Sequence, residues 1–434
     1  MTTAPGAGCE VDLDSSTTRH ELYQARLANT RRFMTTFNVP VMLVRDPFNV
    51  LYITGATNMT IFNLCVPARY LLVFAEGPII LFDYVGGEHL AKDLPTIDEV
   101  RVAHGLSHVA TNGFVADGCA SMAGEIAALV REHVGEPDRL AIDSLPFPAV
   151  DALRAAGFAI TDADVVMSRI RRVKLPLEIA YMREASRRTV DAVRAMEATL
   201  RPGLTEIGLW SRFVGGLLAG HGELVSTRLL ESGPNTFPYF QECGTRVIQD
   251  GDLVCIDTDA VAFESYSADF SRTFLAGDRP ATPQQRTLYG RAYEQLRHNV
   301  SLIGPGVTFE DVARNAWPVP EEHRDSRYYC VGHGLGMIGE YPNLPFHTLG
   351  VPYPLDDAFE PGMVFCVESY IGSHTSGQGV KLEDQLLITD TGIEIMNDYP
   401  FERRLLPCVG PPVPRELARA SPLARVGASC SATT

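Results

Sequence analysis

Apolar and polar positions repeat with two different periods in the first part of the chain. Short apolar runs between 39 and 83, such as "VPVMLVRD" and "PIILFDY", predict strands, and segments with helical spacing interleave with later runs up to about 165. Residues 19–37 also have helical spacing. The pattern predicts an α/β domain over 19–168, preceded by a small, polar and mobile segment at 1–18.

A long amphipathic helix is predicted where the first domain ends. Pro202-Gly203 would stop this helix, and Thr205 would cap the next one. The chain then becomes rich in short strands, which predicts a second domain over 169–410 and a loose tail at 411–434. The apolar positions that define the long helix are Ile179, Met182, Val190, Val193, Met196 and Leu200.

Composition narrows the class of protein. A length of 434 residues favours two domains, and a net charge of −16 with a pI near 5.1 argues against a nucleic-acid or anionic-membrane partner. The nine cysteines are spread without a CxxC pair, as in reduced proteins. With no signal-peptide pattern and no apolar run of about 18 residues, we expect a cytoplasmic protein acting on a small molecule.

Acidic residues stand out in the stretch "VCIDTDAVAFESYSADFSRTF", residues 254–274, which predicts two strands joined by a turn. Asp257 follows a buried apolar run, and strand alternation would point Asp257 and Asp259 to the same face, with Asp269 nearby. Buried like charges are costly unless a cation neutralises them. The stretch therefore predicts a cation site.

Three further residues extend this set. His333 lies in "CVGHGLGM", Glu368 ends "MVFCVES", and Glu383 lies in "GVKLEDQLLIT". Taken singly, a glutamate at a strand end is usually solvated, and a lone histidine is usually a core residue with its hydrogen bonds satisfied. Together, five carboxylates and one imidazole suit two divalent ions, such as Fe, Mn, Co or Zn, better than a thiolate zinc site.

The order of these motifs resembles the pita-bread metalloenzyme superfamily of methionine aminopeptidase, aminopeptidase P, prolidase and creatinase. "RRVKLPLEIAYMREA", "DLVCIDTDA", "SADFSRTF", "VGHGLG", "PGMVFCVES" and "GVKLEDQLLIT" match its motifs, over about residues 20–405. The resemblance implies a creatinase-like N-terminal α/β domain followed by a pita-bread catalytic domain, and a homodimer. It also implies the metal ligands Asp257, Asp269, His333, Glu368 and Glu383.

Departures from the superfamily's peptidases point to another reaction. Tyr239 stands where the peptidases have a proton-shuttling histidine, and the turn after His333 has no histidine before Glu340. Asp259 stands where they usually have a small residue. Because a peptidase without both imidazoles would struggle to move protons to a leaving amine, peptide hydrolysis becomes the second hypothesis.

The dimethylsulfoniopropionate lyase branch of the superfamily is similar in its D-x-D motif and in "PYFQECG" at 238–244. That resemblance adds Asp259 to the ligands and implies a metal pair that includes iron. The implied reaction is a base-assisted elimination that yields dimethyl sulfide and acrylate. A sulfonium cation would sit against aromatic rings, for which Phe62, Tyr239, Tyr328 and Tyr329 are the candidates.

One position disagrees with the lyases, which place an aspartate base where this chain has Gly339. Either Glu340 or Tyr328 would then supply the base, or the substrate would be another small zwitterionic acid. The alternatives are a metal-dependent C–N hydrolase, of Xaa-Pro peptidase or amidohydrolase type, and a non-catalytic binding protein on the same fold.

Overall fold

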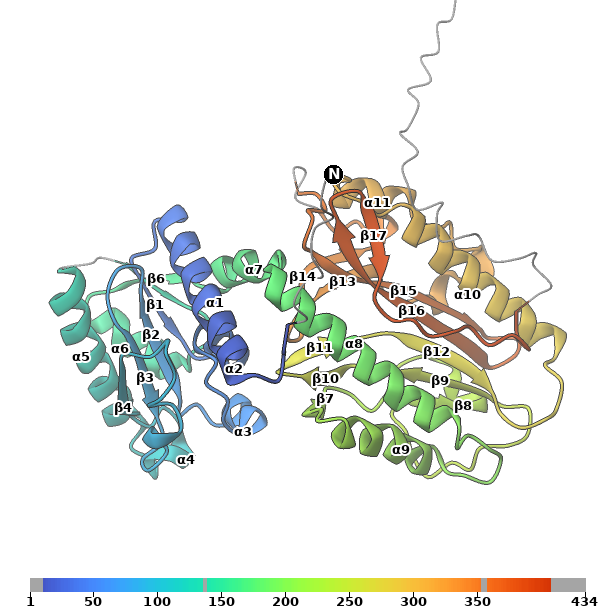
Figure 1. Ribbon diagram of the computed structural model, residues 1–434, viewed down its shortest axis with the longest axis horizontal. Helices are drawn as coiled ribbons and strands as arrows, with labels where there is room; N and C mark the ends of the chain where they lie inside the picture. Colours follow the sequence, from blue (N-terminus) through green and yellow to red (C-terminus); the bar gives the residue numbers. More distant parts are fainter. Residues whose placement is uncertain (1–10, 136–138, 353–356, 407–434) are drawn as a thin grey trace, which may run out of the picture. The chain divides into compact units, whose positions relative to one another are not determined.

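The computed structural model describes residues 11–135, 139–352 and 357–406, and the chain divides into two compact units (Figure 1). Unit 1 contains Met1–Arg183 and Gly336–Tyr341, and unit 2 contains the remainder. Residues 1–10 of the predicted mobile start and the predicted tail at 411–434 lie outside the described residues. No helix in the described ranges is long and apolar enough to cross a membrane.

Unit 1 is built on a mixed sheet in the order β4-β3-β2-β1-β5-β6. The β1–β2 and β2–β3 pairs are antiparallel, and the outer pairs, like β1–β5, are parallel. The central strands are buried along their whole length, as their apolar runs predict. The strands are β1 (Val41–Val44), β2 (Tyr70–Phe74), β3 (Ile79–Asp83), β4 (Glu99–Val102), β5 (Arg139–Ile142) and β6 (Ala159–Asp162).

Helices α5 and α6 cover one face of this sheet, and α1 lies on its other side (Figure 1). The buried residues of α5 recur at helical spacing and pack on the sheet, which explains the amphipathic pattern of that segment. Helix α1 starts at Ser16, where the Ser15 side chain accepts a hydrogen bond from Thr17 N. The helices are α1 (Ser16–Thr36), α2 (Pro47–Thr54), α3 (Thr60–Cys65), η1 (Glu88–Leu90), α4 (His108–Thr111), α5 (Val115–Val134), α6 (Phe147–Ala155) and α7 (Asp164–Arg172).

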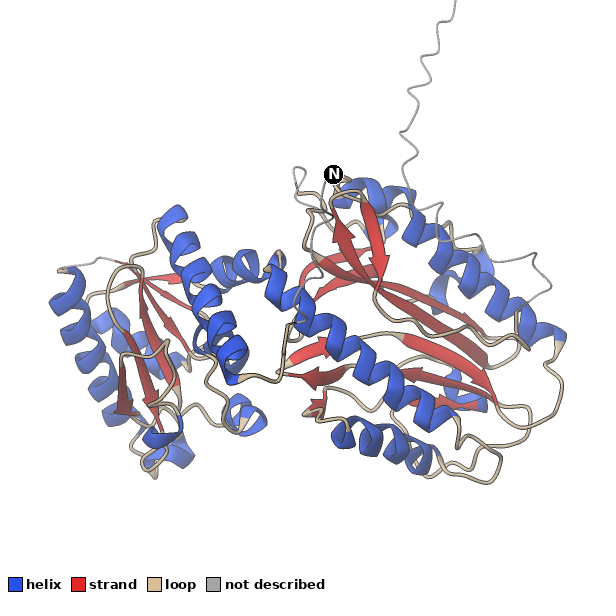
Figure 2. Ribbon diagram, in the orientation of Figure 1, coloured by secondary structure: helices blue, strands red, loops and turns tan. Residues whose placement is uncertain are grey.

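Unit 2 is strand-rich, with sheets ordered β11-β10-β7, β12-β9-β8 and β14-β13-β15-β16-β17 in its described residues (Figure 2). The prediction of two strands within 254–274 was wrong, because breaks at Thr258–Asp259, Glu264–Ser265 and Asp269–Phe270 divide the stretch into four. Asp259, Glu264 and Ser265 have positive φ. The strands are β7 (Leu224–Val225), β8 (Leu230–Ser232), β9 (Leu253–Asp257), β10 (Ala260–Phe263), β11 (Tyr266–Ala268), β12 (Ser271–Leu275), β13 (Cys330–Leu335), β14 (Gly339–Pro345), β15 (Val364–Ser373), β16 (Gln378–Thr389) and β17 (Gly392–Ile395).

The helices of unit 2 begin with clear caps. Thr205 accepts from Gly208 N, which confirms its predicted capping role, and Thr282 forms a capping box with Gln285. The predicted long helix is α8, which ends at Glu197. The helices are α8 (Pro176–Glu197, shared with unit 1), α9 (Glu206–Ala219), η2 (Gly233–Thr236), α10 (Pro283–Ser301), α11 (Phe309–Asn315), η3 (Glu321–Ser326) and η4 (His347–Leu349).

Strand register places two acidic residues of unit 2 opposite each other on neighbouring strands. In the antiparallel pair β15–β16, Glu368 lies directly opposite Glu383. In the neighbouring pair β13–β15, His333 lies opposite Cys366. Two like charges facing each other across a ladder destabilise a sheet unless a cation lies between them. The register therefore indicates that a cation lies between the two glutamates, as the sequence predicted.

Candidate metal centre

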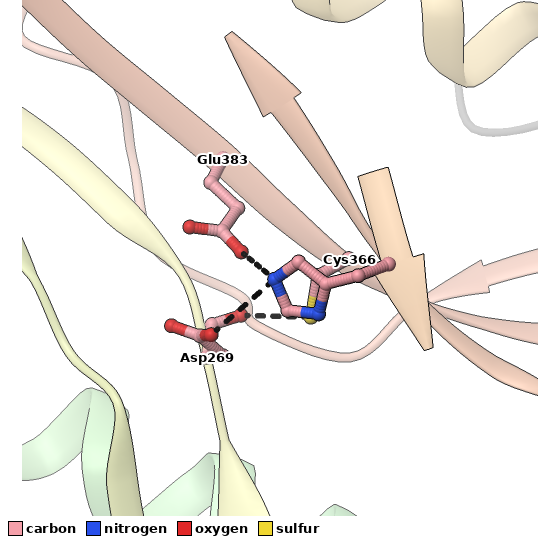
Figure 3. A group of neighbouring side chains, drawn as sticks. Asp269, Cys366 and Glu383 are labelled. Carbon is pink, nitrogen blue, oxygen red and sulfur yellow. Dashed lines mark hydrogen bonds and ion pairs between the residues drawn. The ribbon is translucent and has the colours of Figure 1, made fainter. Parts of the chain in front are cut away.

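All six predicted ligands come together in unit 2. Ligand atoms of Asp257, Asp259 and Asp269 lie within 4.8 Å of one another, as do those of Asp269, His333, Cys366 and Glu383. Figure 3 shows Asp269, Cys366 and Glu383 pointing toward one another. Glu368 joins the second group, since its Oε1 lies 3.5 Å from His333 Nε2. Metal ligation by each residue stays a prediction, but the grouping is a property of the fold.

Asp259 reaches the cluster by a different route from the one expected. Strand β9 ends at Asp257, and Asp259 lies in the following turn with φ of 38°, a conformation that aspartate tolerates better than most residues. Its Oδ2 accepts a hydrogen bond from Thr227 Oγ1 at 2.5 Å, and its backbone N–H donates to Asp269 Oδ1 at 3.2 Å. Strand alternation was therefore the wrong reason for placing the two aspartates together.

A buried lysine stands among the carboxylates, and the sequence analysis did not single it out. Lys381 Nζ lies 3.0 Å from Asp257 Oδ2, 2.7 Å from Glu368 Oε2 and 2.9 Å from Glu383 Oε2. It also donates to Ser271 Oγ at 2.7 Å. A signal was present in "GVKLED", where strand alternation places Lys381 on the same face as Glu383.

The other oxygens of the two glutamates face the imidazole. His333 Nε2 lies 3.5 Å from Glu368 Oε1, 3.8 Å from Asp269 Oδ2 and 4.0 Å from Glu383 Oε1. Atoms bound about 2.1 Å from one ion are about 3–4 Å apart, so these separations suit ligands of a shared ion. Glu383 Oε1 is buried and accepts no hydrogen bond from the described residues. The residues present therefore fit a divalent metal ion.

Electrostatics differ between the two ends of the centre. Burial alone would raise the pKa of Asp257, but the Lys381 ammonium and the Tyr239 hydroxyl hold it well below its usual range. Burial alone would lower the pKa of Lys381, but Asp257, Glu368 and Glu383 raise it well above the ordinary value. Asp257 and Lys381 therefore form a fully charged, buried pair.

The remaining acids hold protons more tightly. Burial and the neighbouring charge of Asp257 raise the pKa of Asp259 to about 6. Burial raises the pKa of Asp269, with a further contribution from Asp259, and burial with Glu368 raises that of Glu383. Glu368 also raises the pKa of His333 to about 9, against the effect of burial. More negative charge is gathered here than one lysine can neutralise, which favours a divalent ion.

Cys366 is a second neighbour that the sequence analysis did not identify. Its thiol lies on the His333-facing side of β15 and donates to the backbone carbonyl of Asp269 at 3.6 Å. Burial, and then the charge of Glu383, raise the pKa of this thiol well above the ordinary value. A neutral thiol is a poor ligand for hard divalent ions, so Cys366 packs beside the centre as a small apolar group.

Tyrosines surround the lysine end of the centre. Tyr239 donates its hydroxyl proton to Asp257 Oδ2 at 2.5 Å, and its ring lies 5.6 Å from that of Tyr328 and 4.8 Å from that of Tyr370. Lys381 Nζ lies 5.0 Å from the Tyr328 ring centroid. Tyr329 packs against Tyr328 with the ring centroids 4.8 Å apart and the rings tilted by 38°, and it is 46 % exposed. Three of the four predicted substrate-facing aromatics thus lie in unit 2 near the ligands.

The other two predicted site residues lie in unit 1. Phe62 is on α3, is 47 % exposed and has its ring 5.9 Å from that of Tyr84. The Glu340 side chain is 6 % exposed, and its carboxylate accepts from Arg171 at 2.7 Å and from Lys174 at 2.9 Å. These two cations lower its pKa against the effect of burial. Glu340 therefore has a structural partnership that the sequence analysis did not foresee.

Comparison with known proteins agrees with this geometry. Residues 180–390 match the model of metallopeptidase family M24. The chain is 34% identical over 372 residues to the dimethylsulfoniopropionate lyases DddP of Roseovarius nubinhibens and Roseobacter denitrificans, covering 84% of this chain and 83% of each relative. Its fold matches the prolidase of Thermococcus sibiricus with a TM-score of 0.72 at 21% identity, over 88% of this chain and 98% of that structure.

These matches confirm the predicted superfamily and the mixed α/β, pita-bread fold of prolidase-like enzymes. The match to the lyases extends over both units, whereas the family model begins in α8 and ends in unit 2. The chain is therefore an enzyme of metallopeptidase family M24, and its sequence is similar to the DddP lyases over most of its length.

Proposed function

We propose that this chain is a metal-dependent carbon–sulfur lyase that cleaves dimethylsulfoniopropionate, or a similar small zwitterionic acid, to dimethyl sulfide and acrylate. The observation that carries the proposal is the position of Asp259 inside the carboxylate cluster. A peptidase site of this family does not need that extra carboxylate, whereas the lyase branch has it. Identity to two DddP lyases over most of the chain supports the same assignment.

The proposed reaction is a β-elimination. A base removes a proton from Cα, the electron pair forms the Cα–Cβ double bond, and the Cβ–S bond breaks to release neutral dimethyl sulfide. Divalent ions held by the six ligands would bind the substrate carboxylate and stabilise the negative charge that develops when the proton leaves. The residues of the chain then have to orient the sulfonium group and move one proton.

In this proposal, the aromatic side chains orient the sulfonium group of the substrate. Tyr239, Tyr328 and Tyr329 line one end of the centre, and a sulfonium cation is attracted to the faces of such rings. Phe62 remains the fourth proposed contact. Rings recognise a soft, permanently charged sulfonium without forming an ion pair, so they would bind the substrate without holding back the neutral product.

Tyr328 and Glu340 remain the two proposed bases. Tyr328 lies in the same unit as the ligands and is buried, and burial with the charge of Glu368 raises its pKa far above the usual range, so its hydroxyl would have to pass its own proton to a neighbouring group before accepting one from Cα. Glu340 is charged but paired with two cations. Tyr328→Phe and Glu340→Gln separate the two, because the variant that removes the base stops proton abstraction while keeping its metal.

The decisive experiment is the detection of dimethyl sulfide in the headspace over purified, metal-loaded protein and dimethylsulfoniopropionate. Acrylate should appear in equal amount. His333→Ala serves as the inactive control, and 3-(methylthio)propionate, which lacks the sulfonium leaving group, should yield nothing. Protein that carries its metal and releases no dimethyl sulfide would contradict the proposal.

A C–N hydrolase is the second candidate, favoured by the family match and by the fold shared with prolidases. Release of proline from Xaa-Pro dipeptides by the same preparation would favour it. The proposal also includes iron as the metal, a centre with positions for two ions that both fill when metal is in excess, a homodimer and a cytoplasmic location. Metal analysis, sedimentation and cell fractionation test these four points separately.

A further inference from the structure

The two ends of the metal centre present very different partners to an incoming ion. At the imidazole end, the contacts of His333 Nε2 with Asp269, Glu368 and Glu383 are 3.5–4.0 Å long, too long for hydrogen bonds. Glu383 Oε1 accepts no hydrogen bond from any described residue. An ion that binds at this end therefore displaces few hydrogen bonds from the ligand oxygens.

At the opposite end, the aspartate oxygens already have donors. Asp257 Oδ1 accepts from Ser271 Oγ at 2.7 Å, while Asp257 Oδ2 accepts from both Tyr239 and Lys381. Asp259 Oδ2 accepts from Thr227 Oγ1. An ion that binds here has to displace hydrogen bonds and come close to a fixed positive charge.

Lys381 is suited to act as that fixed charge. A lysine ammonium is a compact point charge with three donors, and here it reaches three carboxylates and one hydroxyl within 3.0 Å. Its side chain is completely buried. Lysine is also rare in this chain, since Lys and Arg total 37 and only Lys92, Lys174 and Lys381 are lysines. A lysine at position 381 therefore goes against the chain's own preference for arginine.

We propose that Lys381 is a built-in cation of the centre that governs how much metal the Asp257–Asp259 end can hold. One ion binds tightly at the imidazole end, while the ammonium, by repelling a second ion and holding Asp257, makes the other position much weaker. Lys381 is a positioning residue in this scheme and takes no part in bond making. The inference rests on metal binding alone, so it stands even if the substrate is not dimethylsulfoniopropionate.

The test measures metal binding and not turnover. Full-length protein is stripped with a chelator, titrated with Co²⁺ by calorimetry, and analysed for cobalt after desalting. The wild type should retain about one ion per chain and bind the second about 100-fold more weakly. Lys381→Met should strengthen the second step by about 100-fold and retain about two ions. Lys381→Arg keeps the charge and should retain about one.

Two control variants isolate the effect. Lys92→Met removes an exposed lysine, and Lys174→Met removes the other buried, ion-paired lysine, so both should bind cobalt as the wild type does. Two equally tight ions in the wild type would overturn the proposal, and this result does not depend on any variant folding. A folded Lys381→Met whose second step is unchanged would overturn it as well. Loss of lyase activity with the predicted stoichiometry intact would instead count against the proposed function.

Discussion

Each unit of this chain buries a lysine against carboxylate, and the two clusters have opposite balances of charge. In unit 1, one carboxylate, Glu340, meets two cations, Arg171 and Lys174. In unit 2, one cation, Lys381, meets three carboxylates, with Asp259 and Asp269 close by. The pKa of Glu340 is lowered, whereas those of Asp259, Asp269 and Glu383 are raised.

This difference separates a structural cluster from a functional one. The negative charge of Glu340 in unit 1 is neutralised by its two cationic partners. These ion pairs connect α7, the segment before α8 and the segment 336–341. The cluster in unit 2 is short of positive charge and becomes complete only by taking up protons or metal. Buried acids with raised pKa values and too few cations are a better indicator of a metal site than buried acids alone.

The largest expected effect comes from removing a ligand in unit 2. His333→Ala should lose the metal at the imidazole end and lower elimination on the order of 1000-fold, because several kcal/mol of charge stabilisation is lost. Metal content and dimethyl sulfide release measure the two effects. His323→Ala is a matched control, since His323 is also a buried histidine of unit 2, and its imidazole contacts the Gly372 carbonyl and Glu322. Equal metal content in both variants would argue against the site.

Glu340→Gln should mainly destabilise the protein. Removing one charge leaves Arg171 and Lys174 buried without their anion, which costs about 3–5 kcal/mol of unfolding free energy. Urea unfolding of the variant measures this loss, and its cobalt content should equal that of the wild type. If elimination per bound metal falls about 100-fold or more as well, Glu340 is the base. Undiminished elimination leaves Tyr328 in that role.

Metal affinity should rise with pH in unit 2. The raised pKa values, about 6 for Asp259 and about 9 for His333, mean that these groups carry protons which an ion must displace. Apparent affinity for Mn²⁺ should therefore increase about 100-fold between about pH 5.5 and about pH 7.5. Glu340 has a lowered pKa and stays charged over this range, so the pairing in unit 1 is lost only at lower pH. Titration calorimetry in two buffers would also count the protons released.

The smallest predicted effect concerns Tyr239. Tyr239→Phe removes the hydroxyl that donates to Asp257 Oδ2, a hydrogen bond that the second ion has to displace, and should strengthen the second cobalt-binding step by about 10-fold. Tyr370→Phe is its control, because the Tyr370 hydroxyl donates to the backbone carbonyl of Thr236 in the same aromatic cluster. Equal affinities in the two variants would show that the Asp257 contact is unimportant.

Motif spacing in the sequence was enough to predict the superfamily, the fold and the gathering of six side chains. It worked because Glu368 and Glu383 sit at fixed places on strands whose register follows from their apolar runs. The sequence prediction was wrong where turns, or contacts between residues distant in the sequence, determine the position of a side chain. The left-handed turn at Asp259 and the four strands within 254–274 leave no period-two signal, and the pairing of Glu340 with Arg171 depends on residues 169 positions apart.

The return of residues Gly336–Tyr341 to unit 1 makes the two units inseparable by simple truncation. Strand β13, which carries His333, ends at Leu335, and the very next residues belong to the other unit. A fragment beginning at residue 184 would keep Glu340 and lose both of its cations. Such a fragment would therefore lose stability around residues 336–341 although every proposed metal ligand is still present in it.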